Sequence, residues 1–191
     1  MGNNALPEFE NANVGDYVKF GRYPQRLEGE ARPVEWRVLA IENNKALVIS
    51  RYALDAMRFD PESNDWSKSE IRRWLNGEFY NSTFSGEEKA RIKSFNQDNV
   101  FLLSREEAEK YFANSDARKC KPTSYAKAKG ASEIDDFCWW WLRSPYPSIS
   151  NRVYYVSNGG DVRYYVHNII NLDVYNYNGS VRPALWVNLE S

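Results

Sequence analysis

The chain has 191 residues, a length that suits one domain whose core can form without disulfide staples. Its formal net charge is −1 and no run of basic residues stands out, which argues against nonspecific binding to nucleic acid or to anionic membranes. Aromatic residues make up 15% of the chain, and a single core rarely needs so many Trp and Tyr. We therefore expect some of these rings to face a partner.

The N-terminal residues carry neither a basic start nor an apolar stretch, so they do not form a secretory signal. No window of about 18 apolar residues occurs that could cross a membrane. We expect a soluble protein that is cytoplasmic on synthesis, and display on a virion or a cell would need another route. Residues 1–13 are predicted to be loose, and residues 14–191 are predicted to form a single domain.

Three short strands joined by turns are predicted in the first part of the chain, over 17–21, 34–41 and 46–50. Asn43 and Asn44 form the turn before the third strand. Consecutive strands with short connections indicate an antiparallel meander.

The middle of the chain changes to helical spacing. Ile71, Trp74 and Leu75 fall on one helical face, and either Ser67 or Ser69 could cap that helix. Two further helices are predicted to begin with capping boxes, because Ser85 and Ser104 are each followed by a Glu three residues later. Between them, residues 100–103 are predicted to form a short buried strand.

From Phe137 onward the pattern returns to strands, over 137–143, 153–156, 162–166 and 181–189. The three tryptophans at 139–141 cannot all face one way in a strand, and we expect core packing on at least one face. Helices set among mostly antiparallel strands make the predicted fold class α+β.

Residues 146–180 differ in composition from the rest of the chain. These 35 residues contain 7 Tyr, 6 Asn and 4 Ser, but no Lys, Glu, Gln, Met or Trp. Tyr provides rigid amphipathic contact area, and Asn and Ser provide adaptable hydrogen bonds, as in antibody loops. The segment is therefore predicted to be a ligand-binding surface, with ordinary surface hairpins of a β-rich domain as the alternative.

The missing residue types share an explanation at the DNA level. If Asn codons of the form AAC or AAT are randomised at their adenines, every amino acid except Lys, Glu, Gln, Met and Trp becomes reachable. Ala, Thr, Phe and Cys are also absent although they are reachable, so the match is incomplete.

Five motifs carry a resemblance to a known family: 20–25 (FGRYPQ), 35–39 (EWRVL), 71–76 (IRRWLN), 140–145 (WWLRSP) and 181–185 (VRPAL). Together they resemble a bacterial and phage domain family that includes the variable proteins of diversity-generating retroelements. The resemblance covers residues 14–189. Family members are similar to proteins of the C-type-lectin-like fold, which formylglycine-generating enzymes share.

The resemblance implies a C-type-lectin-like α+β fold with antiparallel sheets, two or three helices and a long loop-rich C-terminal binding region at 146–180. It implies a noncatalytic display protein whose variable residues contact a protein or glycan ligand on another cell or particle. It also implies a gene-level link to a reverse transcriptase. The predicted ligand-binding residues are Ser148, Ile149, Asn151, Arg152, Tyr154, Tyr155, Ser157, Arg163, Tyr164, Tyr165, His167, Asn168, Ile169, Ile170, Leu172, Tyr175 and Tyr177.

No catalytic residue, cofactor or metal site is predicted. His167 is the only histidine, which argues against a His-rich metal site and leaves it as a contact residue. Asp135 and Asp136 are adjacent acids that suit a solvated turn. The Glu-Pro-Asn and Trp-Asn-Asp tripeptides of calcium-dependent lectins do not occur in this sequence. Arg143 and Arg182 are expected to brace the loops by pairing with acids or carbonyls.

Two rival functions remain open at this point. An enzyme related to the formylglycine-generating family would need a reactive cysteine pair, but Cys120 and Cys138 both precede the predicted binding segment. We expect two free thiols, with one disulfide as the alternative. The other rival is a fixed structural or assembly domain of a phage or surface appendage. Oligomeric state, ligand identity and active diversification are left open by the sequence.

Overall fold

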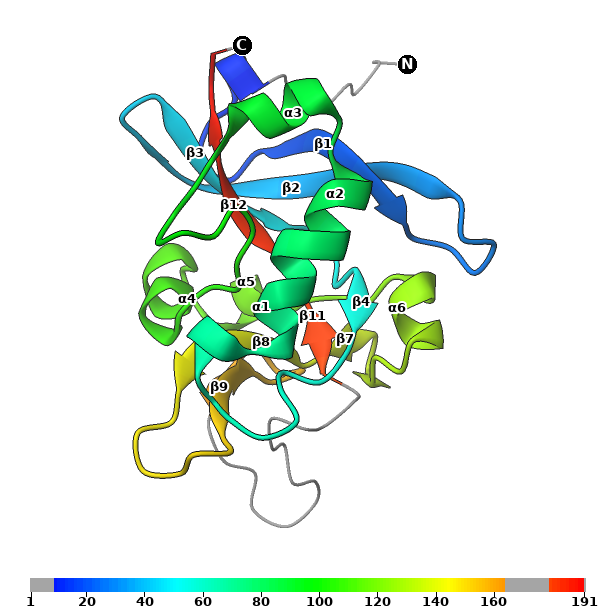
Figure 1. Ribbon diagram of the computed structural model, residues 1–191, viewed down its shortest axis with the longest axis vertical. Helices are drawn as coiled ribbons and strands as arrows, with labels where there is room; N and C mark the ends of the chain where they lie inside the picture. Colours follow the sequence, from blue (N-terminus) through cyan, green and yellow to red (C-terminus); the bar gives the residue numbers. More distant parts are fainter. Residues whose placement is uncertain (1–8, 164–178, 191) are drawn as a thin grey trace.

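The computed structural model describes residues 9–163 and 179–190, and it has an α+β architecture, as predicted (Figure 1). The predicted meander is present as β1, β2 and β3, with Asn43 and Asn44 in the left-handed turn conformation at φ 49° and 61°. The C-terminal strand β12 adds beside β3 and is followed by β5. The first sheet thus has the order β1 (Tyr17–Pro24), β2 (Ala31–Glu42), β3 (Lys45–Ser50), β12 (Ala184–Asn188) and β5 (Ile92–Lys93).

The second sheet is mixed and its strands are shorter. Its central pair, β8 and β9, is antiparallel, and β11 runs parallel to β8. The order is β10 (Val162–Arg163), β9 (Val153–Val156), β8 (Trp140–Pro145), β11 (Ser180–Val181) and β4 (Asp55–Ala56). A separate hairpin pairs β6 (Glu133–Ile134) with β7 (Phe137–Cys138) around Asp135 and Asp136, which form a turn at φ 52° and 70°.

A helical column runs between the two sheets along one side of the molecule (Figure 1). It comprises η2 (Trp66–Lys68), α1 (Glu70–Trp74), the π-turn η3 (Leu75–Phe79) and α2 (Tyr80–Thr83). Ser69, not Ser67, caps α1 by accepting the amide of Arg72. The remaining helices are η1 (Phe9–Asn11), α3 (Gly86–Arg91), α4 (Arg105–Tyr111), α5 (Ser115–Arg118) and α6 (Ser124–Ala128).

Both predicted capping boxes are confirmed. Ser85 and Glu88 cap α3, and Ser104 and Glu107 cap α4, each pair exchanging side-chain and backbone hydrogen bonds. The short helices α5 and α6 were not predicted, and each begins at a side-chain cap, from Asn114 and Thr123 respectively. None of the described helices is long and apolar enough to cross a membrane.

The core lies on both sides of β8. Trp139 and Trp141 pack in one hydrophobic cluster with Trp36, and Trp140 packs in a second cluster with Phe112. All three tryptophans at 139–141 are buried, so core packing extends to both faces of this strand. The second sheet is therefore a buried layer whose strand ends lead into surface loops.

Two predicted strands differ in the structure. Residues 100–103 are buried as predicted, but only Phe101 pairs with another strand, at Ala184. The predicted strand at 181–189 is broken at Arg182 and Pro183, because proline cannot donate to a ladder. The break lets the chain leave the second sheet after β11 and enter the first sheet as β12.

The described part of the N-terminal segment is packed rather than loose. Phe9 is only 3% exposed and contacts Phe20 edge to face, with ring centroids 5.3 Å apart. Phe9 and the buried Ala12 therefore anchor residues 9–12 in the first hydrophobic cluster.

Candidate ligand-binding face

We use the name candidate face for two described loops of the 146–180 segment, which lie at opposite ends of β9 (Val153–Val156). Loop 146–152 joins β8 to β9, and loop 157–161 joins β9 to β10. A register shift between Trp141 and Pro145 bends β8 just before the first loop. Trp140 and Trp141 hold β8 in the core and Tyr154 and Tyr155 hold β9 there, so the loops are presented from a rigid layer.

Loop 146–152 is held from outside by Asn64. The Asn64 Nδ2 donates to the carbonyl oxygens of Tyr146, Ile149 and Arg152, at 3.2, 3.0 and 2.9 Å. The Asn64 backbone amide donates to the carbonyl of Ser150 at 2.8 Å. No feature of the sequence singled out Asn64, because its partners follow it by more than 80 residues.

Loop 157–161 lies against α5. The carbonyl of Gly160 accepts the Arg118 Nε at 2.7 Å, and a Cβ added at Gly160 would lie 1.8 Å from the carbonyl oxygen of Ser115. Gly160 also has a φ of +86°, a conformation that residues with a side chain rarely adopt. The loop can approach α5 this closely only with glycine at this position.

Eight of the predicted ligand-binding residues fall within the described residues, and they divide by exposure. Ser148, Ile149 and Arg163 are exposed, with Ile149 at 37%. Asn151, Arg152 and Ser157 are half-buried. Arg163 forms an exposed ion pair with Asp161 at 2.8 Å. These six residues lie on or beside the two loops.

Tyr154 and Tyr155, in contrast, lie beneath the face. They are 8% and 2% exposed, because neighbouring residues of β9 point to opposite faces and both faces are covered. Tyr155 contacts Trp139 edge to face at 5.8 Å, and Tyr154 receives the Arg105 Nη1 on its hydroxyl at 3.1 Å. We assign both rings to the core that supports the loops.

Nine of the predicted residues lie outside the described residues, and their assignment remains a prediction from sequence. They are Tyr164, Tyr165, His167, Asn168, Ile169, Ile170, Leu172, Tyr175 and Tyr177.

A profile of the DUF6273 family, described as a domain of unknown function, matches residues 43–189. The chain belongs to the DUF6273 family. Comparisons with curated proteins and with solved structures find no match. The match includes β3, the helical column, both loops of the candidate face and β12, whereas η1, β1 and β2 precede it.

Arg143 lies in β8, three residues before the first loop, and its partners are in the DUF6273 scaffold. Its guanidinium binds both carboxylate oxygens of Glu107, at 2.6 and 2.8 Å, and donates to the carbonyl of Leu102. Arg182 donates to the carbonyls of Ser50 and Arg118, at 3.0 and 3.2 Å, and is 3% exposed. The prediction that these two arginines pair with acids or carbonyls is confirmed, and Glu107 serves both the helix cap and Arg143.

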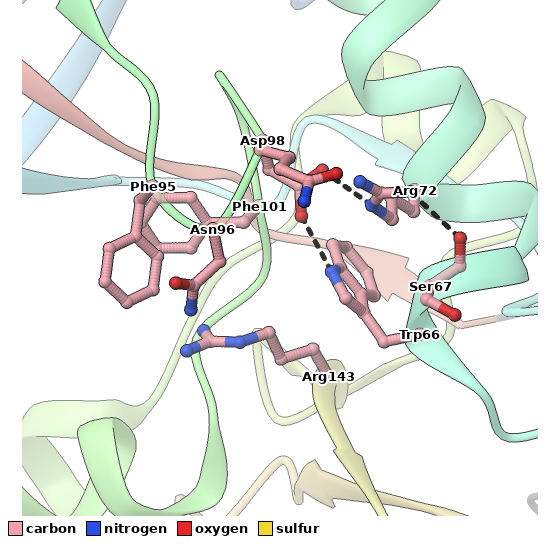
Figure 2. A pocket seen from close by; sticks show the side chains of 9 residues that line it. Trp66, Ser67, Arg72, Phe95, Asn96, Asp98, Phe101 and Arg143 are labelled. Atoms are coloured by element: carbon pink, nitrogen blue, oxygen red, sulfur yellow. Dashed lines mark hydrogen bonds and ion pairs between the residues drawn. The ribbon is translucent and has the colours of Figure 1, made fainter.

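A hollow of about 360 Å³ opens beside Arg143. One of the residues that line it, Trp66, follows Asn64 closely in the sequence. Figure 2 shows the Trp66 indole and the Arg72 guanidinium turned toward the Asp98 carboxylate, to which they donate at 2.8 and 2.6 Å. The hollow is lined by Trp66, Ser67, Arg72, Phe95, Asn96, Gln97, Asp98, Phe101 and Arg143. Its carboxylate is already paired, which favours an uncharged occupant over an ionic one.

The rim of this hollow is a strained turn. Asn96 and Gln97 occupy left-handed backbone conformations, at φ 49° and 71°, between the paired residues Phe95 and Asp98. Neither side-chain amide has a hydrogen-bond partner among the residues that the structure describes. The side chains of Asn96 and Arg143 point toward one another across the opening (Figure 2). Of the residues that line the hollow, only Arg143 was considered from sequence for a role at the binding segment; Ser67, Arg72 and Phe101 were considered only as parts of a helix cap, a motif and a buried strand.

The two cysteines are neighbours although they are distant in sequence. Cys120 and Cys138 pair across an antiparallel bridge, and both are buried free thiols, as expected. Burial raises the pKa of Cys120, but the Cys138 thiol, the Arg182 guanidinium and the Ala53 amide more than offset this effect and leave its pKa lowered. The hydrogen bond to Cys120, with burial, raises the pKa of Cys138.

Proposed function

We propose that this DUF6273 protein is a noncatalytic display protein that contacts a protein or glycan ligand through residues 146–180. The observation that carries the proposal is the unusual Tyr- and Asn-rich composition of this segment, whose described exposed residues lie on two loops held by the scaffold. Apolar Ile149 is exposed beside polar Ser148, a combination that suits a binding surface. The C-type-lectin-like assignment and the retroelement origin belong to this proposal and rest on the sequence resemblance.

The binding energy would come from a few anchoring side chains. In interfaces of this kind, a central tyrosine contributes roughly 2 kcal/mol or more. Tyr164, Tyr165 and Tyr175 are the candidates for this role, since Tyr154 and Tyr155 are buried in the core. Replacing the three candidates by Ala should abolish ligand binding and leave the melting temperature nearly unchanged. A fall of tens of degrees would mean that these rings are core residues.

The DNA around the gene tests the origin of the segment. The proposal predicts a near-copy of the 3′ end of the gene with adenines at the positions that vary, next to a reverse transcriptase gene. Absence of both would leave a fixed family member whose surface serves one partner.

A thiol-dependent enzyme is the second candidate. It is favoured by Cys120 and Cys138, which lie side by side in the fold. Its difficulty is access, because the two residues are 1% and 0% exposed. Thiol-dependent turnover that is lost on Cys138→Ser would support this candidate over the display protein.

A further inference from the structure

The first loop of the candidate face is organised by main-chain atoms. Within it, the amide of Tyr146 donates to the carbonyl of Arg152 at 2.8 Å, and the amide of Arg152 donates to the carbonyl of Ile149 at 3.2 Å. The four hydrogen bonds from Asn64 also end on carbonyl oxygens of this loop. Every residue type has a carbonyl, so these bonds do not depend on which side chains the loop carries.

Asn64 is well suited to act as a fixed clamp because its own loop is fixed. The Asp60 carboxylate accepts the amides of Glu62 and Ser63 through one oxygen and the amide of Glu70 through the other. Asp60 is 7% exposed and ties this loop to the first turn of α1. The loop that carries Asn64 is therefore anchored to the helical column and not to the loops of the candidate face.

The second loop is held in the same way by Arg118. Its Nε donates to the carbonyl of Gly160 at 2.7 Å. The backbone carbonyl of Arg118 in turn accepts the Trp140 Nε1 and the Arg182 Nη1, each at 3.2 Å. Here again a scaffold side chain contacts only a main-chain atom of the loop.

We propose that Asn64 and Arg118 are positioning residues that fix the paths of loops 146–152 and 157–161 by binding main-chain atoms. In the second loop Ser157 and Gly160 must be kept, because the Ser157 hydroxyl accepts the Asp161 amide at 3.2 Å and Gly160 lies close to Ser115. The face can then exchange Ser148, Ile149 and Asn151 without changing the backbone that presents them. This inference deepens the proposed function and rests on it for its biological meaning. The property it asserts is structural, and it can be tested without a ligand.

Proline is an informative exception to this tolerance. The amides of Ile149 and Arg152 donate hydrogen bonds within the loop, and proline has no amide hydrogen. We expect proline to be depleted at Ile149 in any set of folded loop variants, whereas other residue types are accepted there.

The test is a loop library in three backgrounds. Ser148, Ile149 and Asn151 are randomised together in the full chain, displayed on yeast and scored by resistance to protease. The backgrounds are wild type, Asn64→Ala and Asn76→Ala. Asn76 is the matched control, because its side chain also binds main-chain atoms, those of Asn99 and Val100, but in the scaffold.

We expect most wild-type library members to resist protease. In the Asn76→Ala background, resistance should fall by a similar factor for every member, since distant effects add. In the Asn64→Ala background, resistance should depend on the loop sequence, and the folded fraction should fall at least about fivefold more than additivity predicts. Arg118→Met should have the same effect on a library at Asn158, with Ser157 kept because its hydroxyl accepts the Asp161 amide.

Two results would overturn the inference: a wild-type library that is mostly unfolded, or an Asn64→Ala library that behaves like the Asn76→Ala library. If Asn64→Ala does not fold with the parental loop, the Asn64→Ser variant is used in its place. Hydrogen exchange of the amides of residues 146–152 is then measured as well. Unprotected loop amides in the wild type would then also count against the clamp. A library that folds but never yields a ligand would contradict the proposed function alone.

Discussion

The two sheets are stabilised in different ways. In the first sheet, β12 pairs with β3 over five consecutive residues, and β2 pairs with both of its neighbours along most of its length. In the second sheet, β10 and β11 each make only short pairings. Both sheets contain register shifts and buried tryptophans, but the shorter ladders of the second sheet are supplemented by side chains that bind main-chain atoms of its loops.

This difference separates the part of the protein that must keep its sequence from the part that need not. A backbone ladder with a buried face depends on its apolar pattern, because a slip of one residue turns every side chain to the wrong side. A loop held through carbonyl oxygens has no such dependence. We infer that the side chains of the face can change if the buried tryptophans, the positioning residues Asn64 and Arg118, and Gly160 are kept.

The largest effect should come from Gly160→Ala, which places a methyl group against the Ser115 carbonyl and strains the backbone. We expect a loss of about 3 kcal/mol in the free energy of unfolding, measured by urea denaturation. Gly159→Ala is the matched control, because its Cβ would lie 3.7 Å from the nearest side-chain atom. Equal losses for the two variants would show that loop 157–161 is not held closely on α5.

The next effect concerns the pairing of Arg143 with Glu107. Arg143→Met leaves the Glu107 carboxylate without its partner in a site where both side chains are less than 20% exposed. We expect a loss of about 2 kcal/mol in the free energy of unfolding. Glu109→Gln, which removes an ion pair with Arg105 that is more than 40% exposed, should change stability by less than about 0.5 kcal/mol. A loss no larger than that of the control would mean that the pairing of Arg143 with Glu107 does not stabilise the fold.

Gln97→Gly should stabilise the protein by about 0.5–1 kcal/mol, because glycine tolerates the left-handed conformation at this turn. Asp136→Gly should give a similar gain at a turn of nearly the same geometry away from the hollow. Gln97→Ala keeps the unfavourable conformation and should give no gain. Thermal melts of the three variants would distinguish relief of strain from an effect of losing the Gln97 side chain.

The smallest effect is a pH dependence at Asp55, which lies in β4 at one edge of the second sheet and accepts the Tyr23 hydroxyl at 2.5 Å. Burial raises the pKa of Asp55 despite this hydrogen bond and one from the Ala56 amide. The folded protein therefore keeps the proton to higher pH than the unfolded chain does. The stabilisation from this group is fully present below the unfolded pKa and is lost as pH rises through the folded pKa.

Asp55→Asn removes this titration. The free energy of unfolding of wild type minus that of the variant should therefore fall as pH rises above the ordinary carboxyl pKa of about 4, as the carboxyl ionises. Parallel pH profiles for the two proteins would mean that Asp55 has an ordinary pKa in the fold.

Local signals in the sequence predicted local structure well. The capping boxes at Ser85 and Ser104 and the turn at Asn43 were predictable because each depends on residues within one turn of chain. The break at Pro183 was visible in the sequence but was outweighed by the apolar residues around it. Its role in passing the chain from one sheet to the other depends on the tertiary arrangement.

The site was predictable only in part, for the same reason. Ser148, Ile149 and Arg163 are exposed as a binding surface requires, but the alternation of β9 does not reveal that Tyr154 and Tyr155 are covered on both sides. The clamp by Asn64 joins positions more than 80 residues apart, and a lone Asn in a polar loop carries no signal of such a contact.

The central claim is that the scaffold is fixed in sequence and the residues of the face vary, and it can be tested without knowing the ligand. Resequencing this gene from independent isolates tests it directly. We predict substitutions concentrated in codons for residues 146–180 and confined there to adenine positions, with Asn64, Trp141, Tyr155 and Gly160 unchanged. Substitutions spread evenly over the gene, or frequent changes at these four positions, would contradict it.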